Sequence, residues 1–139
     1  VNLETNFGSD VNGSSGQHPG TDSPGAASVA AMGEANGFDG TSPFAPESYD
    51  AAALIMLAMQ AAGSSSSADY KSKIIDVANA PGVKILPGEL AKGLKILADG
   101  GEIDYVGGSA VELIGPGESA GAYRQIEMKD GKITTVKYR

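Results

Sequence analysis

Four of the 17 acidic side chains, together with the single histidine, are the candidates for acid–base or metal chemistry, and all of these lie in the first half of the chain. Asp22, Asp39, Glu47 and Asp50 lie within about thirty residues of one another and could supply paired carboxylates for proton transfer. The single histidine, His18, has no second histidine or cysteine near it, and its spacing to Asp22 and Asp39 matches no metal-ligand pattern. We therefore interpret His18 as a solvent-facing loop residue and expect no metal and no cofactor.

Motifs for nucleophilic catalysis or phosphate binding are not expected either. The turn Gly115-Pro116-Gly117 lacks the preceding strand, the lysine and the following helix of a phosphate-binding loop. We also expect no nucleophile elbow and find no catalytic constellation. Four carboxylates in an acidic chain are ordinary, so we predict that the protein is not an enzyme. An α/β enzyme that uses Asp22, Asp39 or Glu47 stays an alternative, and activity screens of carboxylate variants would decide it.

Composition narrows the classes of partner. The 139 residues match one ordinary domain, and the net charge of -7 argues against binding to nucleic acid or to anionic membranes. Cysteine is absent, which excludes disulfides and thiolate metal sites. No basic segment followed by an apolar stretch stands at the start, so no signal peptide is expected in this chain, as in a mature secreted protein or a fragment.

The elements that must position these side chains are organised around the segment Pro43–Gly63. Its run Ala51–Met59 holds nine apolar residues in succession, which is typical of a helix buried on several sides and is too short to span a bilayer. Pro46 suits the first helical turn, and Gly63 suits a left-handed cap at the end. We predict a core helix here.

Other elements follow from local patterns. Ser23-Pro24 predicts the start of a helix over Gly25–Asn36, and Asp130-Gly131 predicts a tight hairpin turn between two strands. The remaining expectations are a tail or loop-rich region at Val1–Gly20, an extended segment at Val11–Ser15, helices at Ala68–Asn79 and Glu89–Ala98, and strands at Ile103–Val106, Ala110–Ile114, Gly121–Lys129 and Ile133–Tyr138. This order indicates an α/β class.

Two stretches carry a resemblance to a known family. They read SPFAPESYDAAALIMLAMQAAGS and PGELAKGLKILADGGEIDYVGGSAVELIGPGESAGAYRQIEMKDGK. In order and spacing they resemble the C-terminal part of the branched-chain amino acid (Leu/Ile/Val-type) substrate-binding proteins of ABC transporters. The resemblance runs from about Val11 to the end, and it rests on five weak motifs at Phe44, Ser48–Ala52, Ile103–Ser109, Gly115–Glu118 and Tyr123–Lys132.

The resemblance implies part of a periplasmic-binding-protein type I fold, in which two Rossmann-like lobes are joined by three crossing segments. It places residues 1–17 at the end of one lobe and in the second crossing, at Val11–Gln17. Residues 18–121 form the C-terminal half of the N-terminal lobe, and residues 122–139 form the third crossing, at Ala122–Met128, and a hairpin that returns to the other lobe. The helices would then pack on an incomplete sheet, so we expect a fragment that self-associates through Ala51–Met59.

The ligand-binding residues implied by the resemblance are Phe44, Ala45, Pro46 and Glu47, in the loop before the central helix. Phe44 matches an aromatic residue that packs on the ligand side chain; the alternative is a phenylalanine that closes the top of the core. Glu47 departs from the neutral residue usual at that place, which favours a cationic group on the ligand over a plain leucine-like one. The chain alone should bind ligand poorly, because the groups for the ligand's amino and carboxyl ends lie elsewhere.

The resemblance further implies an extracytoplasmic, periplasmic component of an amino-acid importer, which binds a small-molecule ligand and meets an ABC permease in the full protein. Branched-chain amino acids or related small polar solutes are the expected cargo, and no nucleic acid is expected as a partner. Two alternatives stay open: a free-standing interaction domain that dimerises through the central helix, and a ligand-sensing regulator of the same fold.

Overall fold

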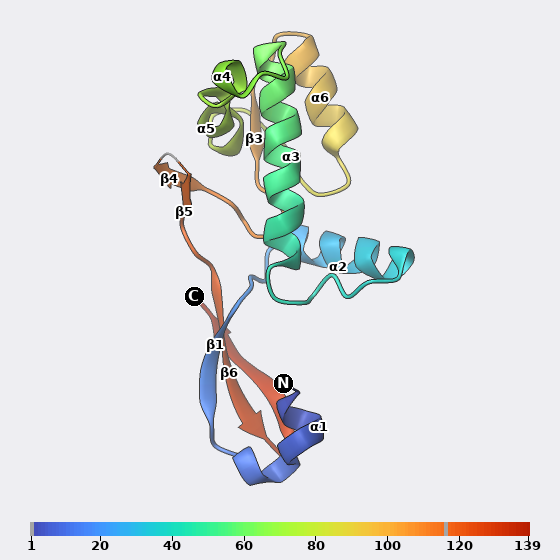
Figure 1. Cartoon of the computed structure of the whole chain (residues 1–139), viewed down its shortest axis with the longest axis vertical. Coiled ribbons are helices and arrows are strands. Elements are labelled where there is room, and N and C mark those ends of the chain that lie inside the picture. Colours follow the sequence, from blue (N-terminus) through green and yellow to red (C-terminus); the bar gives the residue numbers. More distant parts are fainter. Residues whose placement is uncertain (1, 116) are drawn as a thin grey trace.

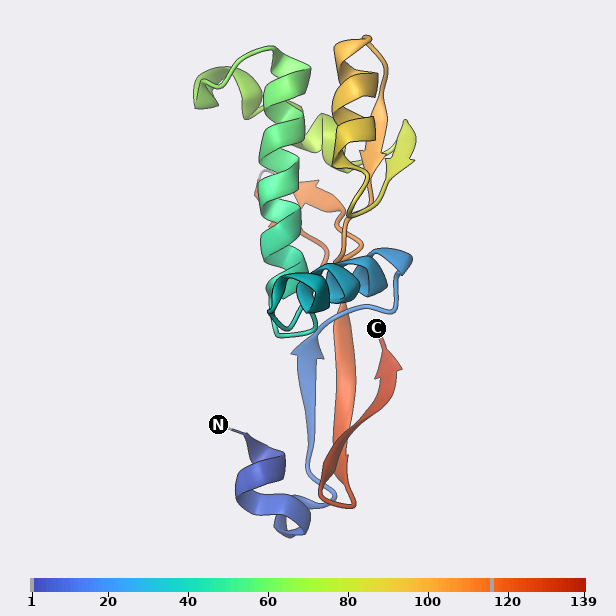
Figure 2. The ribbon, with the colours of Figure 1, turned by 90° about the vertical axis from the view of Figure 1, so that its right-hand side faces the viewer.

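A helical body and a three-stranded sheet stand end to end along the long axis of the molecule (Figures 1 and 2). The computed structural model describes residues 2–115 and 117–139. The chain passes from the sheet to the helices after residue 19 and returns to the sheet before residue 123. The fold is mixed α/β with small sheets, as the sequence predicts.

The centre of the helical body is α3, Ala45–Ala62, with Pro46 in its first turn and Gly63 as the left-handed cap at φ 62°. Ala53, Leu54, Leu57 and Ala58 form a buried stripe that faces the core. The opposite face is open: Ile55 and Met56 are 39% and 44% exposed. The expectation of burial on several sides is therefore wrong for this chain, because its described elements cover only one side of the helix.

The helix α2, Pro24–Asn36, lies across the N-terminal end of α3 (Figure 2). The Ser23 side chain accepts a hydrogen bond from the Ala26 amide, and Gly37 ends the helix in the left-handed region at φ 78°. The start of the helix agrees with the Ser23-Pro24 prediction, and Gly37 directly follows the last residue of the predicted helix. Gly33 packs directly against the backbone of Gly40, so the loop that follows the helix folds back tightly onto it.

The single helix expected at Ala68–Asn79 is wrong: two short helices occupy this stretch, α4, Ser67–Tyr70, and α5, Lys73–Ala78. No glycine or proline marks the break between them. Packing imposes it, because Val77 and Ala78 turn into the core against α3. The helix α6, Leu90–Ala98, agrees with the prediction and packs its leucines on the same core.

A two-stranded parallel sheet packs against α5 and α6. β2, Val83–Ile85, pairs with β3, Ile103–Tyr105, and α6 connects them. The side chains of Ile85, Ile103 and Tyr105 are at most 1% exposed. The sequence predicts β3 but not β2, whose three residues lie between two Pro-Gly pairs and are too few to show a pattern. The expected strand Ala110–Ile114 starts later, as β4, Leu113–Gly115, which pairs with β5, Glu118–Ser119.

The lower body is an antiparallel sheet in the order β1-β6-β7. β6, Tyr123–Lys129, and β7, Lys132–Tyr138, form the predicted hairpin, with Asp130 and Gly131 at φ 53° and 73°. β1 spans Ser15–Pro19. The extended segment expected at Val11–Ser15 is wrong, because a 3-10 turn at Gly8–Val11 and the left-handed Gly13 precede the strand.

The N-terminal residues are attached to this hairpin and do not form a separate tail. The helix α1, Leu3–Phe7, has Asn2 as its cap. The Glu4 carboxylate accepts a hydrogen bond from the amide of Ile133, and the Asn12 side chain accepts one from Gly131. Of the two interpretations left open for this region, the loop-rich part of a larger body therefore describes residues 2–20, while Val1 lies outside the described residues.

Candidate functional site

Phe44, the predicted ligand contact, stands exposed at the start of α3. Its side chain is 61% exposed, and its backbone lies in the left-handed region at φ 67°. A phenylalanine in this conformation is strained, which is a feature of functional sites. The alternative of a core-closing phenylalanine is wrong, because the side chain is exposed and does not belong to the core cluster.

The three residues that follow Phe44 are half-buried in the first turn of α3. One carboxylate oxygen of Glu47, Oε2, is buried and has no hydrogen-bond partner among the described residues. A buried oxygen without a donor costs about 1–3 kcal/mol. Glu47 is therefore an acceptor that a cationic or N–H-bearing group would satisfy. Ala45 and Pro46 supply apolar surface beside it.

Asp50 is the centre of a buried hydrogen-bond cluster and is 2% exposed. Its Oδ1 accepts hydrogen bonds from the Tyr105 hydroxyl at 2.9 Å and the Gly108 amide at 2.7 Å. Its Oδ2 accepts from the amide and the hydroxyl of Ser109, at 2.7 and 2.6 Å. Four donors thus surround one carboxylate, so its role is to tie α3 to the loop that follows β3. Asp50 is not accessible for the acid–base chemistry considered from the sequence.

The same cluster changes the chemistry of Tyr105. Burial, together with the nearby Asp50 carboxylate, raises the pKa of the Tyr105 hydroxyl well above its ordinary value. The two glycines of the loop make the close contact possible. A side chain at Gly107 would collide with the Asp50 carboxylate, and one at Gly108 would collide with Val29 of α2. Three elements, α2, α3 and the loop after β3, therefore meet at this point.

The other carboxylates considered as catalytic pairs have separate local roles. Asp39 lies on the surface and accepts hydrogen bonds from Thr41 and Ser42, and these bonds lower the pKa of its carboxyl, with those from Thr41 the largest cause. Asp22 is exposed. Among residues 2–115 and 117–139, no group of three or more histidine, aspartate or glutamate side chains is placed to hold a metal ion.

The segment Gly117–Gly121 reads GESAG and so matches the Gly-x-Ser-x-Gly motif of a nucleophile elbow. The expectation that the chain lacks such a motif is therefore wrong at the level of sequence. In a nucleophile elbow the serine stands on a tight turn between a strand and a helix. Here Ser119 ends the exposed strand β5 and its hydroxyl donates to the Ala120 carbonyl, with no helix after it. The serine therefore does not stand in the strand–turn–helix arrangement of a nucleophile elbow. Pro116, within the adjacent turn singled out in the sequence, lies outside the described residues.

A cavity of about 300 Å³ lies at the junction of the two bodies. His18, Arg124 and Tyr138 form its strand-side wall; they are direct cross-strand partners on β1, β6 and β7. The opposite wall comes from the first turns of α2, and Pro46 is the one predicted ligand residue that lines the cavity. His18 is thus a half-buried strand residue, and its interpretation as a solvent-facing loop residue is wrong.

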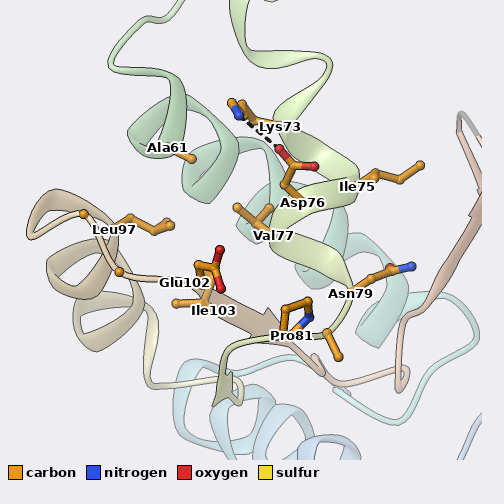
Figure 3. A pocket seen from close by; sticks show the side chains of 13 residues that line it. Ala61, Lys73, Ile75, Asp76, Val77, Asn79, Pro81, Leu97, Glu102 and Ile103 are labelled. Atoms are coloured by element: carbon orange, nitrogen blue, oxygen red, sulfur yellow. Dashed lines mark hydrogen bonds and ion pairs between the residues drawn. The ribbon is translucent and has the colours of Figure 1, made fainter.

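A second cavity, of about 560 Å³, opens at the other end of the helical body (Figure 3). Its floor includes Val77 and Ile103, and the Lys73–Asp76 ion pair, with its nitrogen and oxygen 3.1 Å apart, stands at its rim. The ion pair is half exposed. The cavity offers an apolar floor beside the start of β3 but no arrangement of donors or nucleophiles.

Comparison of the chain with protein-family models, with curated proteins and with solved structures gave no match. Among the described residues, no helix is long and apolar enough to cross a membrane.

Proposed function

We propose that this chain forms part of an extracytoplasmic solute-binding protein of an ABC importer, with branched-chain amino acids or related small polar solutes as cargo. The proposal combines the sequence resemblance with one structural observation. The chain passes between its two bodies twice, and the two passages, through β1 and β6, lie side by side as antiparallel partners. Two neighbouring strands between two bodies are compatible with a hinge that closes over a ligand.

The sheet of the helical body supports the proposal that further strands complete this fold. A parallel sheet is normally covered on both faces and extended by several strands. Here β2 and β3 pair only with each other among the described residues. The open face of α3, with Ile55 and Met56, is the surface that such an extension would need.

Within this proposal, Phe44 contacts the apolar side chain of the ligand and Glu47 meets a donor or cation on it. Ala45 and Pro46 shape the wall between them. The strained backbone of Phe44 supports its role because such strain clusters at functional sites. The unsatisfied oxygen of Glu47 supports its role because a buried acceptor is costly without a donor.

The test uses the full polypeptide that the reading frame encodes, screened by thermal shift with aliphatic, acidic, basic and amide amino acids. We expect stabilisation by aliphatic or related small polar amino acids, and its loss in Phe44→Ala. Phe38→Ala is the matched control. Phe38 is also exposed, at 53%, but it lies just after α2 and is not one of the proposed ligand residues. Stabilisation by no amino acid, or equal stabilisation of Phe44→Ala and wild type, contradicts the proposal.

A second candidate function is an interaction domain that dimerises through α3. The open face formed by Ala51, Ala52, Ile55 and Met56 favours it. Sedimentation measurements across protein concentrations test this, and Met56→Glu should shift the chain toward monomer if the face is the contact. A monomer at high concentration excludes the dimerising domain and counts equally against self-association of the fragment.

A further inference from the structure

The cavity at the junction of the two bodies has an unusual distribution of hydrogen-bond donors. His18, Arg124 and Tyr138 occupy directly opposite positions on three adjacent strands, so their side chains stand on the same face of the sheet. All three line the cavity. Arg124 and Tyr138 can each donate a hydrogen bond, and an arginine can only donate, whereas the Nδ1 of His18 already donates to the Pro19 carbonyl. The sheet therefore presents the donors of Arg124 and Tyr138 to one cavity.

Arg124 is not satisfied within the protein. Its guanidinium forms no ion pair and no hydrogen bond with the described residues, and its Nε atom is buried. The residue as a whole is half-buried, but a donor nitrogen that is shielded from water and has no acceptor still costs free energy. The cost is notable in a chain of net charge -7, where carboxylates are plentiful. An anionic group in the cavity would satisfy it.

The opposite wall restricts what kind of anion fits. Ala26, Ala27 and Ala30 of α2, together with Pro46, supply apolar surface. Beside them the cavity is lined by polar residues, including one carboxylate: Asp22, Ser23, Thr41 and Ser42. The amide of Ala26 at the start of α2 is already capped by Ser23, so the helix terminus does not itself provide the binding group. The cavity volume of about 300 Å³ is at the lower end for small-molecule sites.

We propose that this cavity binds a small organic carboxylate with a short aliphatic body. The carboxylate pairs with the fork of Arg124, whose planar donors match its two oxygens, and the Tyr138 hydroxyl donates beside it. The aliphatic body lies against the alanines of α2. The cavity shares Pro46 with the proposed solute site, but neither Phe44 nor Glu47 lines it, so the inference does not rest on the proposed function.

The test is an amide-resolved NMR titration of the chain with butyrate, with the isosteric neutral amide butyramide, and with inorganic phosphate. We expect saturable shifts with butyrate at residues 18–30 and 123–125, and no saturable shift with butyramide. Binding of phosphate as tight as that of butyrate, or equal shifts with butyramide, overturns the assignment of an organic carboxylate.

The deciding variant is Arg124→Gln, with Arg139→Gln as its matched control. Both remove one positive charge, but Arg139 lies outside the cavity and reaches Gln125. Arg124→Gln should weaken butyrate binding at least about tenfold, as expected for loss of a charged hydrogen-bond pair, and Arg139→Gln should leave it unchanged. An urea unfolding curve of each variant reports whether the fold is retained. If Arg124→Gln does not fold, Ala27→Leu replaces it as the test. Its larger side chain occupies cavity space beside the apolar wall, so it must abolish butyrate binding. Unchanged binding in a folded Arg124→Gln or Ala27→Leu refutes the site.

Discussion

Replacing Asp50 with alanine should destabilise the helical body more than any other single carboxylate change. The substitution removes the acceptor of four hydrogen bonds, from Tyr105, Gly108 and the two donors of Ser109. Each hydrogen bond to a charged group contributes about 1.5–3 kcal/mol, offset by the cost of burying the carboxylate. Breaking such a buried network typically costs about 3–5 kcal/mol, and we expect Asp50→Ala to fall in this range.

Two further variants separate shape from charge. Asp50→Asn keeps the volume but turns one acceptor oxygen into a donor, which then faces either the Gly108 or the Ser109 amide. We expect it to cost about 2 kcal/mol, less than alanine, because one oxygen still accepts. Ser109→Ala removes one bond and should cost about 1.5 kcal/mol.

The assay is urea unfolding followed by far-ultraviolet circular dichroism, analysed for a change in midpoint at constant slope. Asp76→Ala is the control, since Asp76 forms an exposed ion pair with Lys73 that contributes less than about 1 kcal/mol. If Asp50→Ala costs no more than Asp76→Ala, the carboxylate does not hold the loop after β3 to α3, and the reasoning is refuted.

Three other predictions follow from single positions. Tyr105 should resist ionisation when the tyrosines are titrated by ultraviolet absorbance, because burial beside Asp50 raises its pKa above the ordinary 10.0. The stability that its protonated form provides is fully present below pH 10.0 and declines as the pH rises above this value, so the free energy of unfolding must fall there. Simultaneous titration of every tyrosine in the folded protein would disprove this. Gly25→Ala should reduce the free energy of unfolding by more than about 3 kcal/mol, because the new methyl group would overlap the carbonyl oxygen of Gly107. Gly16→Ala should be tolerated, because its methyl group would meet nothing closer than 3.8 Å. Similar unfolding midpoints for both variants would show that α2 does not need this close approach. Gly131→Ala should lower the free energy of unfolding by about 1–2 kcal/mol, because the residue lies at φ 73°. Asp130→Asn should change it by less than about 0.5 kcal/mol. Equal effects of the two variants in urea unfolding would rule out a strained hairpin turn.

Local patterns determined most elements whose signals lie within a few residues. Ser23 and Gly37 bound α2, and Asp130-Gly131 sets the hairpin, because caps and turns depend on backbone geometry that one or two residues dictate. The apolar run of α3 likewise predicted a helix. It did not predict which side of the helix would be covered, since that depends on which other elements lie beside it.

Tertiary structure alone decided which residues meet around Asp50 and which line the cavity at the junction of the two bodies. Asp50 had the same appearance in the sequence as Asp22 or Asp39, and only the return of Gly108 and Ser109, more than fifty residues later, makes it a buried acceptor. His18 and Arg124 are more than a hundred residues apart and become neighbours only because β1 and β6 pair in one register. The sequence by itself therefore determined elements with local signals, while the sheet register and the packing of α3 decided which polar groups meet, because a buried charge is defined by what surrounds it and not by its position in the chain.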